Sequence, residues 1–330
     1  MEKVSWGIIG CGNVTEVKSG PAFQQVPDSS LVAVMRRDGA KAADYAQRHR
    51  VPKWYNRAED LIADADVTAL YIATPPAFHE KYTIAALEAG KPVYVEKPFS
   101  SSLDGCYRMH AAAKKSGIPL CIAHYRRALP KFLAIKKILE QEVIGKVCAV
   151  QIRMNLPDQS VELAARGENN WRILPAISGG GIFFDLAPHQ LDLLIYFFGQ
   201  AIDHSGTATN QAGLYKAEDT VSGIARLANE IEFSGEWHFC APDTIKEDLF
   251  EIKGTSGRMI FSTFGHDLTI ISVSGEEKIE FAPPQHIQQP MIEKVTQYFL
   301  GKGPNPCSAE EAIHSFLLMD AFTRKYYHRD

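Results

Sequence analysis

Residues 4–15 read Val-Ser-Trp-Gly-Ile-Ile-Gly-Cys-Gly-Asn-Val-Thr, an apolar run that ends in two glycines one residue apart. We expect a strand over residues 4–9 and a tight turn at Gly10. Gly12 would let a pyrophosphate approach the backbone, where the free N–H groups of a following helix face it. Thr15 replaces the third glycine of the usual fingerprint, and an ordinary strand-to-helix turn would use the same glycines. In an alternating context, the pattern predicts dinucleotide binding by Gly10, Gly12, Asn13 and Val14.

The sequence around this motif alternates short apolar runs with helical patterns. Strands are expected at 4–9, 31–35, 69–73, 92–95 and 120–123, and helices at 40–50, 58–63, 79–89 and 103–115. Such alternation is typical of a parallel sheet with helices on both faces. We therefore predict an α/β Rossmann domain over residues 1–122.

The pattern changes after residue 127. A helix near 131–140 precedes a strand at 147–154 and an apolar helix at 186–198. Residues 202–281 then read as consecutive strands separated by Gly, Asn and Asp turns, followed by helices at 290–300 and 309–326. Residues 123–330 are therefore predicted to form an α+β domain with a large, mostly antiparallel open sheet.

The composition is that of an ordinary globular protein. The chain has 330 residues, of which 45% are apolar, and a formal net charge of −4. Without a basic excess, neither nucleic acid nor an anionic membrane surface is expected as a partner. No apolar run reaches the roughly 18 residues of a membrane helix, and no basic-then-apolar segment resembles a signal peptide. We expect a cytoplasmic protein.

The cysteines give no sign of a disulfide framework or a zinc site. None of the six forms a C-x-x-C pair, and they are scattered over the whole chain. We expect buried free thiols in a reducing compartment, and no bound metal.

The second expected strand ends with Val-Met-Arg-Arg at 34–37. An NAD-binding domain usually has Asp or Glu here, to bind the ribose 2′-hydroxyl. Arginine instead matches the geometry of a phosphate and can stack on adenine. We predict that Arg36 and Arg37 bind a 2′-phosphate, which favours NADP(H) over NAD(H). The alternative is two solvated loop arginines that pair with Asp38.

Residues 94–98 read Tyr-Val-Glu-Lys-Pro and end another expected strand. The carboxyl edge of an open α/β sheet is where ligands bind, so Lys97 would point toward the nicotinamide end. A lysine there can hydrogen-bond a substrate hydroxyl and stabilise the developing alkoxide. For a lysine considered alone, an ordinary surface position is the preferred interpretation.

A second cluster of chemical side chains follows the triple glycine at 179–181. Asp185, His189 and Asp192 are spaced four and three residues apart, so on a helix they share one face. Pro188 suits such a helix only in its first turn or at a kink. A histidine flanked by carboxylates can be an acid/base group. A capped helix whose histidine bonds its own neighbours explains the same pattern.

Together these motifs resemble those of the Gfo/Idh/MocA oxidoreductases, the family of glucose–fructose oxidoreductase and inositol dehydrogenase. The resemblance runs in order over nearly the whole chain. It implies that the C-terminal sheet covers the active site on one face and forms subunit contacts on the other, giving a homodimer or homotetramer. The elements that match are G-x-G-N at 10–13, Thr-Pro-Pro at 74–76 with His79, Glu-Lys-Pro at 96–98, and the triple glycine before Asp185 and His189.

The resemblance implies roles for individual residues. Lys97 would be the central catalytic lysine, and His189 would accept the proton during oxidation or donate it during reduction. Asp185 would orient His189 or bind a substrate hydroxyl. The loop at residues 74–79, here named the cofactor loop, and the Glu-Lys-Pro turn would contact the ribose and nicotinamide half of the cofactor. The contacting residues would be Thr74, Pro75, His79, Glu96 and Lys97. Substrate-facing positions would be Tyr125, Arg126, Trp171 and Arg172.

The implied reaction is hydride transfer between NAD(P)(H) and a sugar, polyol or related hydroxy or keto compound. Two other functions suit the same fold. A non-catalytic NADP-sensing regulator would need neither Lys97 nor His189. A glycosidase with tightly bound NAD would oxidise its substrate only transiently, and the Arg36–Arg37 pair argues against it.

Overall fold

The structure is a computed structural model that describes residues 2–158 and 170–328. The chain folds into two compact units, Met1–Leu129 with Pro284–Ile313, and Pro130–Pro283 with His314–Asp330. It therefore leaves the first unit after Leu129 and later returns to it. From the sequence we expected a single domain boundary after residue 122, which does not include residues 284–313 in the first unit.

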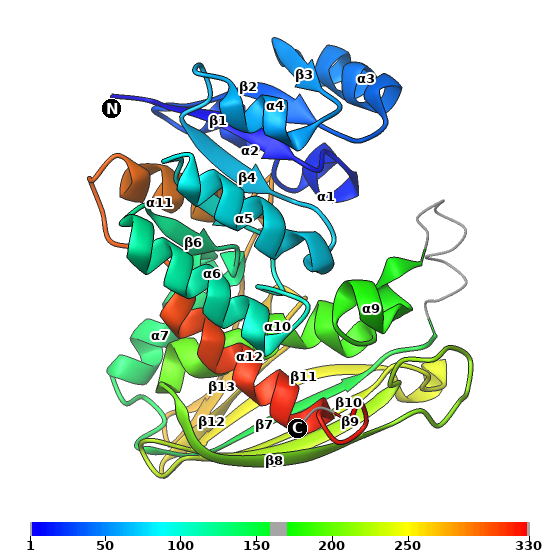
Figure 1. Ribbon diagram of the computed structural model, residues 1–330. Helices are drawn as coiled ribbons and strands as arrows, with labels where there is room; N and C mark the ends of the chain where they lie inside the picture. The colour runs from blue at the N-terminus through cyan, green and yellow to red at the C-terminus, as the bar shows by residue number, and fades with distance from the viewer. Residues whose placement is uncertain (1, 159–169, 329–330) are drawn as a thin grey trace. The chain divides into compact units, whose positions relative to one another are not determined.

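A six-stranded parallel sheet forms the centre of the first unit, in the order β3-β2-β1-β4-β5-β6 (Figure 1). This is the predicted Rossmann sheet. Its strands are β1 (Val4–Ile9), β2 (Ser29–Met35), β3 (Lys53–Tyr55), β4 (Ala69–Ile72), β5 (Val93–Val95) and β6 (Leu120–Ile122). Its helices are α1 (Asn13–Val17), α2 (Ala22–Gln25), α3 (Gly39–His49), α4 (Ala58–Ala63), α5 (His79–Glu88), α6 (Leu103–Ser116) and α11 (Gln289–Phe299), with 3₁₀ turns η1 (Pro76–Phe78) and η2 (Tyr125–Ala128).

The carboxyl ends of these strands lie in register. Ile9 pairs with both Met35 and Ile72, Ile72 pairs with Val95, and Val95 pairs with Ile122. The loops that follow the strands therefore start along one edge of the sheet. This edge carries the glycine turn, the arginine pair, the cofactor loop and the Glu-Lys-Pro turn.

The return segment completes the first unit. The indole of Trp6 on β1 packs 5.4 Å from the ring of Phe299 on α11. At the β6 edge of the sheet, the backbone N–H of Ile122 donates to the carbonyl oxygen of Cys307 at 3.0 Å. The side-chain amide of Asn305 also donates to the carbonyl oxygen of Leu120, at 2.9 Å. Residues 305–307 thus cover a sheet edge that would otherwise present unpaired backbone groups.

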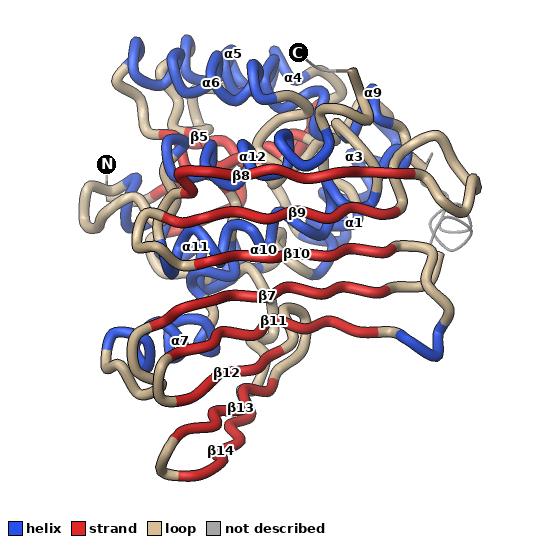
Figure 2. The backbone as a smooth tube through the Cα atoms, turned by 90° about the horizontal axis from the view of Figure 1, so that it is seen from below, coloured by secondary structure: helices blue, strands red, loops and turns tan. Residues whose placement is uncertain are grey.

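An eight-stranded sheet forms the second unit, in the order β14-β13-β12-β11-β7-β10-β9-β8 (Figure 2). The β7–β10 pair is parallel and the other pairs are antiparallel, which confirms a large, mostly antiparallel sheet. The strands are β7 (Val147–Asn155), β8 (Ala201–Thr209), β9 (Thr220–Leu227), β10 (Glu232–His238), β11 (Glu247–Gly254), β12 (Gly257–Phe261), β13 (Asp267–Ser272) and β14 (Gly275–Glu280). The helices are α7 (Pro130–Glu140), α9 (Pro175–Ser178), α10 (Ile182–Phe198) and α12 (Ala309–Thr323, which begins in the first unit), with 3₁₀ turns η3 (Trp171–Ile173) and η4 (Asp243–Ile245).

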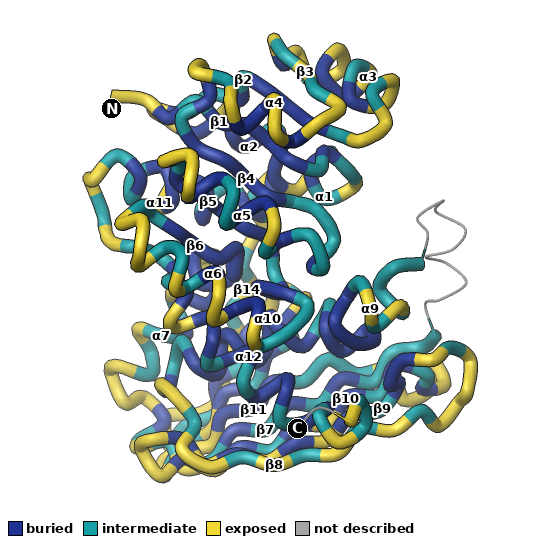
Figure 3. Tube along the Cα trace, in the orientation of Figure 1, coloured by how far each residue is buried: buried dark blue, intermediate teal, exposed yellow. Residues whose placement is uncertain are grey.

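Helix α10 is buried on nearly all sides, which agrees with its continuous apolar sequence (Figure 3). It begins at Ile182, earlier than the apolar run at 186–198 suggested. Pro188 therefore lies inside the helix and not in its first turn. Asp185, His189 and Asp192 all fall within this helix, as their spacing requires for a shared face.

The six cysteines are free thiols, but they are not all buried. Cys148 is exposed near the start of β7, before that strand enters the core, and Cys240 is half-buried. The expectation of uniformly buried thiols was therefore wrong at these two positions. Burial raises the pKa of the Cys11 thiol, beside the glycine turn, to about 11.

Candidate active site

The glycine turn after β1 packs tightly against the loop after β4. Gly10 has a φ of +97°, and a Cβ there would lie 2.9 Å from backbone atoms of Ala73 and Thr74. Only glycine suits both this conformation and this approach. At Gly12 the nearest atom to an added Cβ is 3.9 Å away, so the space beside its backbone is open. The two glycines thus have different roles, close packing at Gly10 and open access at Gly12.

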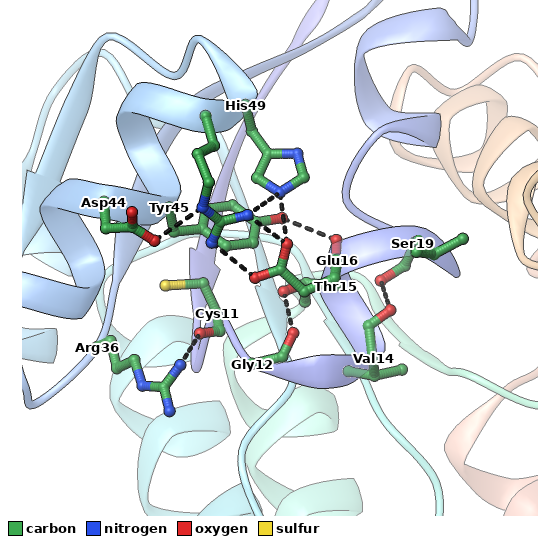
Figure 4. A network of polar contacts seen from close by, with 12 residues as sticks. Cys11, Gly12, Val14, Thr15, Glu16, Ser19, Arg36, Asp44, Tyr45 and His49 are labelled. Atoms are coloured by element: carbon green, nitrogen blue, oxygen red, sulfur yellow. Dashed lines mark hydrogen bonds and ion pairs between the residues drawn. The ribbon is translucent and has the colours of Figure 1, made fainter. Parts of the chain in front are cut away.

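Thr15 takes the place of the third glycine and braces the turn. Its hydroxyl donates to the carbonyl oxygen of Gly12 at 2.8 Å, and the hydroxyl of Tyr45 donates to the carbonyl oxygen of Thr15 at 2.8 Å. The carboxylate of Glu16, the next residue, accepts two hydrogen bonds from the guanidinium of Arg48, at 2.8 and 2.9 Å (Figure 4). This ion pair lowers the pKa of Glu16 to about 2.

The two arginines after β2 have different surroundings. Arg36 donates from Nη1 to the carbonyl oxygen of Cys11 at 3.2 Å, which places its guanidinium beside the glycine turn. Arg37 is exposed, with its guanidinium 5.3 Å from the centre of the Phe78 ring. Asp38 caps α3 and pairs with Lys41. Among the described residues neither arginine makes an ion pair, so the expected alternative of pairing with Asp38 is not seen.

His79 connects the cofactor loop with the Glu-Lys-Pro turn. Its Nε2 lies 2.7 Å from the carbonyl oxygen of Thr74, and its Nδ1 lies 3.1 Å from that of Pro98. Burial lowers the pKa of His79 to about 4, so the ring is neutral near pH 7. A neutral ring has one N–H, and the shorter contact indicates that it donates to Thr74. The Thr74 hydroxyl is buried, and within the described chain it has no hydrogen-bond partner.

The Glu-Lys-Pro turn is anchored by a buried carboxylate. Glu96 Oε1 accepts hydrogen bonds from the hydroxyl of Tyr71 at 2.5 Å and from Nε2 of Gln288 at 2.7 Å. Glu96 Oε2 accepts the backbone N–H of Lys97 at 3.1 Å. Lys97 itself is half-buried. Both oxygens of Glu96 therefore accept hydrogen bonds from the protein. From the sequence we had expected only that Glu96 contacts the cofactor.

Tyr125 and Arg126 follow β6 in the turn η2. Both are buried, and the guanidinium of Arg126 lies 5.4 Å from the Tyr125 ring centre. The turn η2 starts at the same edge of the sheet as the glycine turn and Lys97, because β6 is in register with β5.

In the second unit, helix α10 presents Asp185 one turn before His189. Nε of Arg172 donates to Oδ2 of Asp185 at 2.9 Å, and the Arg172 guanidinium lies 4.4 Å from the Trp171 ring centre. The ring of Phe264 lies edge-on to His189, with 5.6 Å between ring centres. The structure thus brings Trp171, Arg172 and Asp185 into contact and places His189 one turn further along the same helix.

The N-terminus of α10 is held by a buried carboxylate. The backbone N–H of Gly181 donates to both oxygens of Glu218, at 2.9 and 2.8 Å, and the hydroxyl of Tyr327 donates to Glu218 Oε2. A Cβ on Gly181 would lie 2.4 Å from the carbonyl oxygen of Glu218. The missing side chain at Gly181 therefore makes room for Glu218 of the same unit.

Four contributors to these contacts were not anticipated from the sequence: Tyr71, Gln288, Glu218 and Phe264. Only Phe264 could have been suspected from the sequence, because a large aromatic residue is uncommon in a polar turn; in the structure it is exposed. The other three carry no such signal, since their partners lie far away in the chain.

Within residues 2–158 and 170–328, no three His, Cys, Asp or Glu side chains are grouped so that they could hold a metal ion. In the same ranges, no helix has the length and apolar character needed to cross a membrane.

Two family models match the chain. The model described as the oxidoreductase family with an NAD-binding Rossmann fold, GFO_IDH_MocA, matches residues 4–124, and the GFO/IDH/MocA C-terminal domain matches residues 132–260. "Oxidoreductase P35" of Formosa agariphila is 43% identical over 97% of this chain and 98% of its own length. A 1,5-anhydro-D-fructose reductase of Ensifer adhaerens is 27% identical over 77% of this chain and 74% of its own.

The fold is also seen in solved structures. A levoglucosan dehydrogenase, solved in complex with NADH and levoglucosan, superimposes with a TM-score of 0.84 at 21% identity. The match covers 99% of this chain and 98% of that one.

Proposed function

Because the chain belongs to the Gfo/Idh/MocA oxidoreductase family, with its NAD-binding Rossmann domain, we propose that it transfers hydride between a nicotinamide cofactor and a CH–OH carbon of a sugar, polyol or related compound. The observation that carries this proposal is the edge of the first sheet. There, the open Gly12 turn, the Thr74 loop and Lys97 start from neighbouring strand ends.

The first unit suits such a cofactor. The open space at Gly12 would receive the pyrophosphate, and the buried hydroxyl of Thr74 is a polar group available to the nicotinamide half. Arg36 and Arg37 are guanidinium groups without carboxylate partners in the described chain, a setting that suits a 2′-phosphate. We therefore propose NADP(H) as the preferred cofactor.

The side chains would divide the remaining chemistry between them. When bound, the cofactor supplies the hydride acceptor or donor. Lys97 would donate a hydrogen bond to the substrate oxygen and stabilise its negative charge. His189 would take the hydroxyl proton during oxidation and return it during reduction. Asp185, fixed by Arg172, would orient a substrate hydroxyl or His189.

Relatives support a sugar-like substrate. The Ensifer adhaerens relative is named for a reaction on 1,5-anhydro-D-fructose, and a relative from Xenopus laevis is a trans-1,2-dihydrobenzene-1,2-diol dehydrogenase, 28% identical over 87% of this chain. Both names describe compounds with neighbouring oxygenated ring carbons. We propose the same class here, with the enzyme acting as a homo-oligomer.

The test is a spectrophotometric screen at ~340 nm, the absorbance of reduced nicotinamide, of sugars, inositols and keto-sugars with both cofactors. Turnover of one compound that is lost in Lys97→Met supports the proposal. A compound that is consumed with no net absorbance change indicates a glycosidase with transient oxidation. No turnover of any compound, with cofactor bound stoichiometrically, favours a regulator.

A further inference from the structure

Gln288 reaches the Glu-Lys-Pro turn from a distant part of the chain. It lies in the return segment, 192 residues from Glu96, and only 1% of it is exposed. Its Nε2 donates to Glu96 Oε1 at 2.7 Å. A carboxylate oxygen only accepts hydrogen bonds, so this contact fixes which end of the Gln288 amide faces Glu96.

The backbone on both sides of this contact is fixed. The N–H of Gln288 donates to the carbonyl oxygen of Lys18 at 3.1 Å. Two residues earlier, the ring of His286 bonds the carbonyl oxygen of Val17 through Nδ1 at 2.6 Å and meets Nε2 of Gln25 at 3.1 Å. The segment is therefore held against residues 17–25 before its side chain enters the interior.

Only the nitrogen end of the Gln288 side-chain amide makes a hydrogen bond within the described chain. Among the described residues its Oε1 is buried without a hydrogen-bond partner. Burying a carbonyl oxygen without a partner costs free energy, so the hydrogen bond from the amide nitrogen must compensate for this cost. That nitrogen contacts Glu96, which also accepts from Tyr71. Burial and the neighbouring Glu96 raise the pKa of Tyr71 well above its usual range, so Tyr71 remains a donor.

We propose that Gln288 is a positioning residue for Lys97. Gln288 and Tyr71 hold one oxygen of Glu96, and the other oxygen holds the backbone N–H of Lys97. The amide of Gln288 thereby sets how the Lys97 ammonium is presented at the sheet edge. This inference rests on the proposed function, in which Lys97 bonds the substrate oxygen.

Gln288→Met removes the donor and keeps the side-chain length. Misplacing a reacting group by about 1 Å costs up to roughly 100-fold in rate, so we expect kcat to fall at least about tenfold, with KM changing less than about threefold. Gln285→Met is the matched control, an exposed glutamine in the same segment that should behave as wild type.

A second measurement needs no substrate. In cofactor-free protein, the rate at which acetic anhydride modifies Lys97, followed by peptide mass spectrometry, reports how its amine is presented. We expect this rate to change several-fold in Gln288→Met and to stay unchanged in Gln285→Met. The exposed Lys115 of α6 serves as the internal reference.

Gln288→Glu gives a pH signature. Two carboxyl groups this close raise one pKa of the pair, and the protonated partner can still donate to Glu96. We expect kcat of this variant to approach wild type at low pH and to fall as pH rises through that raised pKa. A residue that only fills space would change the melting temperature without this new decline in kcat.

Two results would overturn the inference. One is folded Gln288→Met with wild-type kcat and wild-type Lys97 acetylation. The other is a Gln288→Glu pH profile that superimposes on that of the wild type. If Gln288→Met does not fold, the Gln288→Glu profile alone is the deciding test. Full activity in Lys97→Met would instead contradict the proposed function. An inactive Lys97→Met beside a fully active Gln288→Met contradicts only the role of Gln288.

Discussion

The Nε2 atom of His79 lies 2.7 Å from the carbonyl oxygen of Thr74, inside the protein. The imidazole therefore fixes the cofactor loop as a neutral donor. Because burial lowers its pKa from 6.5 to about 4, the unfolded chain binds a proton at this site more readily than the folded chain does.

Folding stability should consequently fall as pH drops from about 7 toward 4. From the two pKa values, the contribution of His79 between pH 7 and pH 5 is about 2 kcal/mol. Urea unfolding at both pH values measures it. His79→Gln keeps a donor but does not titrate, so its loss of stability over this interval should be smaller by that amount. An identical pH dependence in both proteins would show that His79 is not buried in the neutral form.

Arg37→Ala should weaken NADPH far more than NADH. A charge-assisted contact to phosphate is worth about 1.5–3 kcal/mol, so the Kd for NADPH should rise roughly tenfold to over a hundredfold. Fluorescence titration with both cofactors measures the effect. Lys41→Ala, on the neighbouring helix and paired with Asp38, is the control. Equal losses for NADPH and NADH in Arg37→Ala would remove the 2′-phosphate assignment.

Lys97→Met and His189→Asn should each lower turnover by about 10²–10⁴-fold, because positioned acid/base groups contribute that much. Cofactor Kd should change little, since the glycine turn and the arginine pair provide most of the expected contacts. If both residues act on one hydroxyl, the double variant should lose less than the product of the two single losses. Melting curves of the same variants separate chemistry from stability. A folded His189→Asn enzyme with wild-type turnover would exclude His189 and direct attention to Tyr125.

Gly181→Ala should destabilise the second unit by about 1–3 kcal/mol, because the new methyl group meets backbone that cannot move freely. Its Cβ would lie 2.4 Å from the carbonyl oxygen of Glu218. Gly303→Ala is the control, since its Cβ meets nothing closer than 3.8 Å. Denaturant unfolding compares the two. Equal stability of both variants would mean that α10 can shift away from Glu218 at no cost.

The proposed homo-oligomer should be visible by light scattering at micromolar concentration. The exposed face of the large sheet includes Ile224 on β9, which is 60% exposed and would be covered if this face forms the subunit contact. Ile224→Glu should weaken association without changing the fold seen by circular dichroism. A wild-type protein that is only monomeric would contradict the proposal.

The regular elements could be predicted where the apolar pattern is strong. Val4–Ile9 and Ala58–Ala63 occur as expected, because a doubly buried strand leaves a continuous apolar run and an amphipathic helix leaves a period of about 3.6 residues. Strand β3 was not predicted. It is only three residues long and follows Pro52, and its pairing with β2 stabilises it more than its own pattern does.

The site was predictable only in part, for a related physical reason. Motifs such as Glu-Lys-Pro point to candidate site residues, but not to the residues that hold these candidates in place. The contact between Gln288 and Glu96 depends on where a distant helix packs, and an amphipathic period specifies the helix without specifying its partner. A glutamine in a loop gives no local signal of this kind.

The discontinuous first unit has a consequence for synthesis of the chain. Trp6 packs against Phe299, and Ile122 bonds Cys307, so the sheet lacks these partners until the return segment has been translated. At about 5–20 residues per second, the interval between Leu129 and Ile313 lasts on the order of 10–40 s. During that time the β6 edge of the nascent polypeptide is uncovered, and the indole of Trp6 has its Phe23 neighbour but lacks Phe299. The domain that is begun first is thus among the last to be completed.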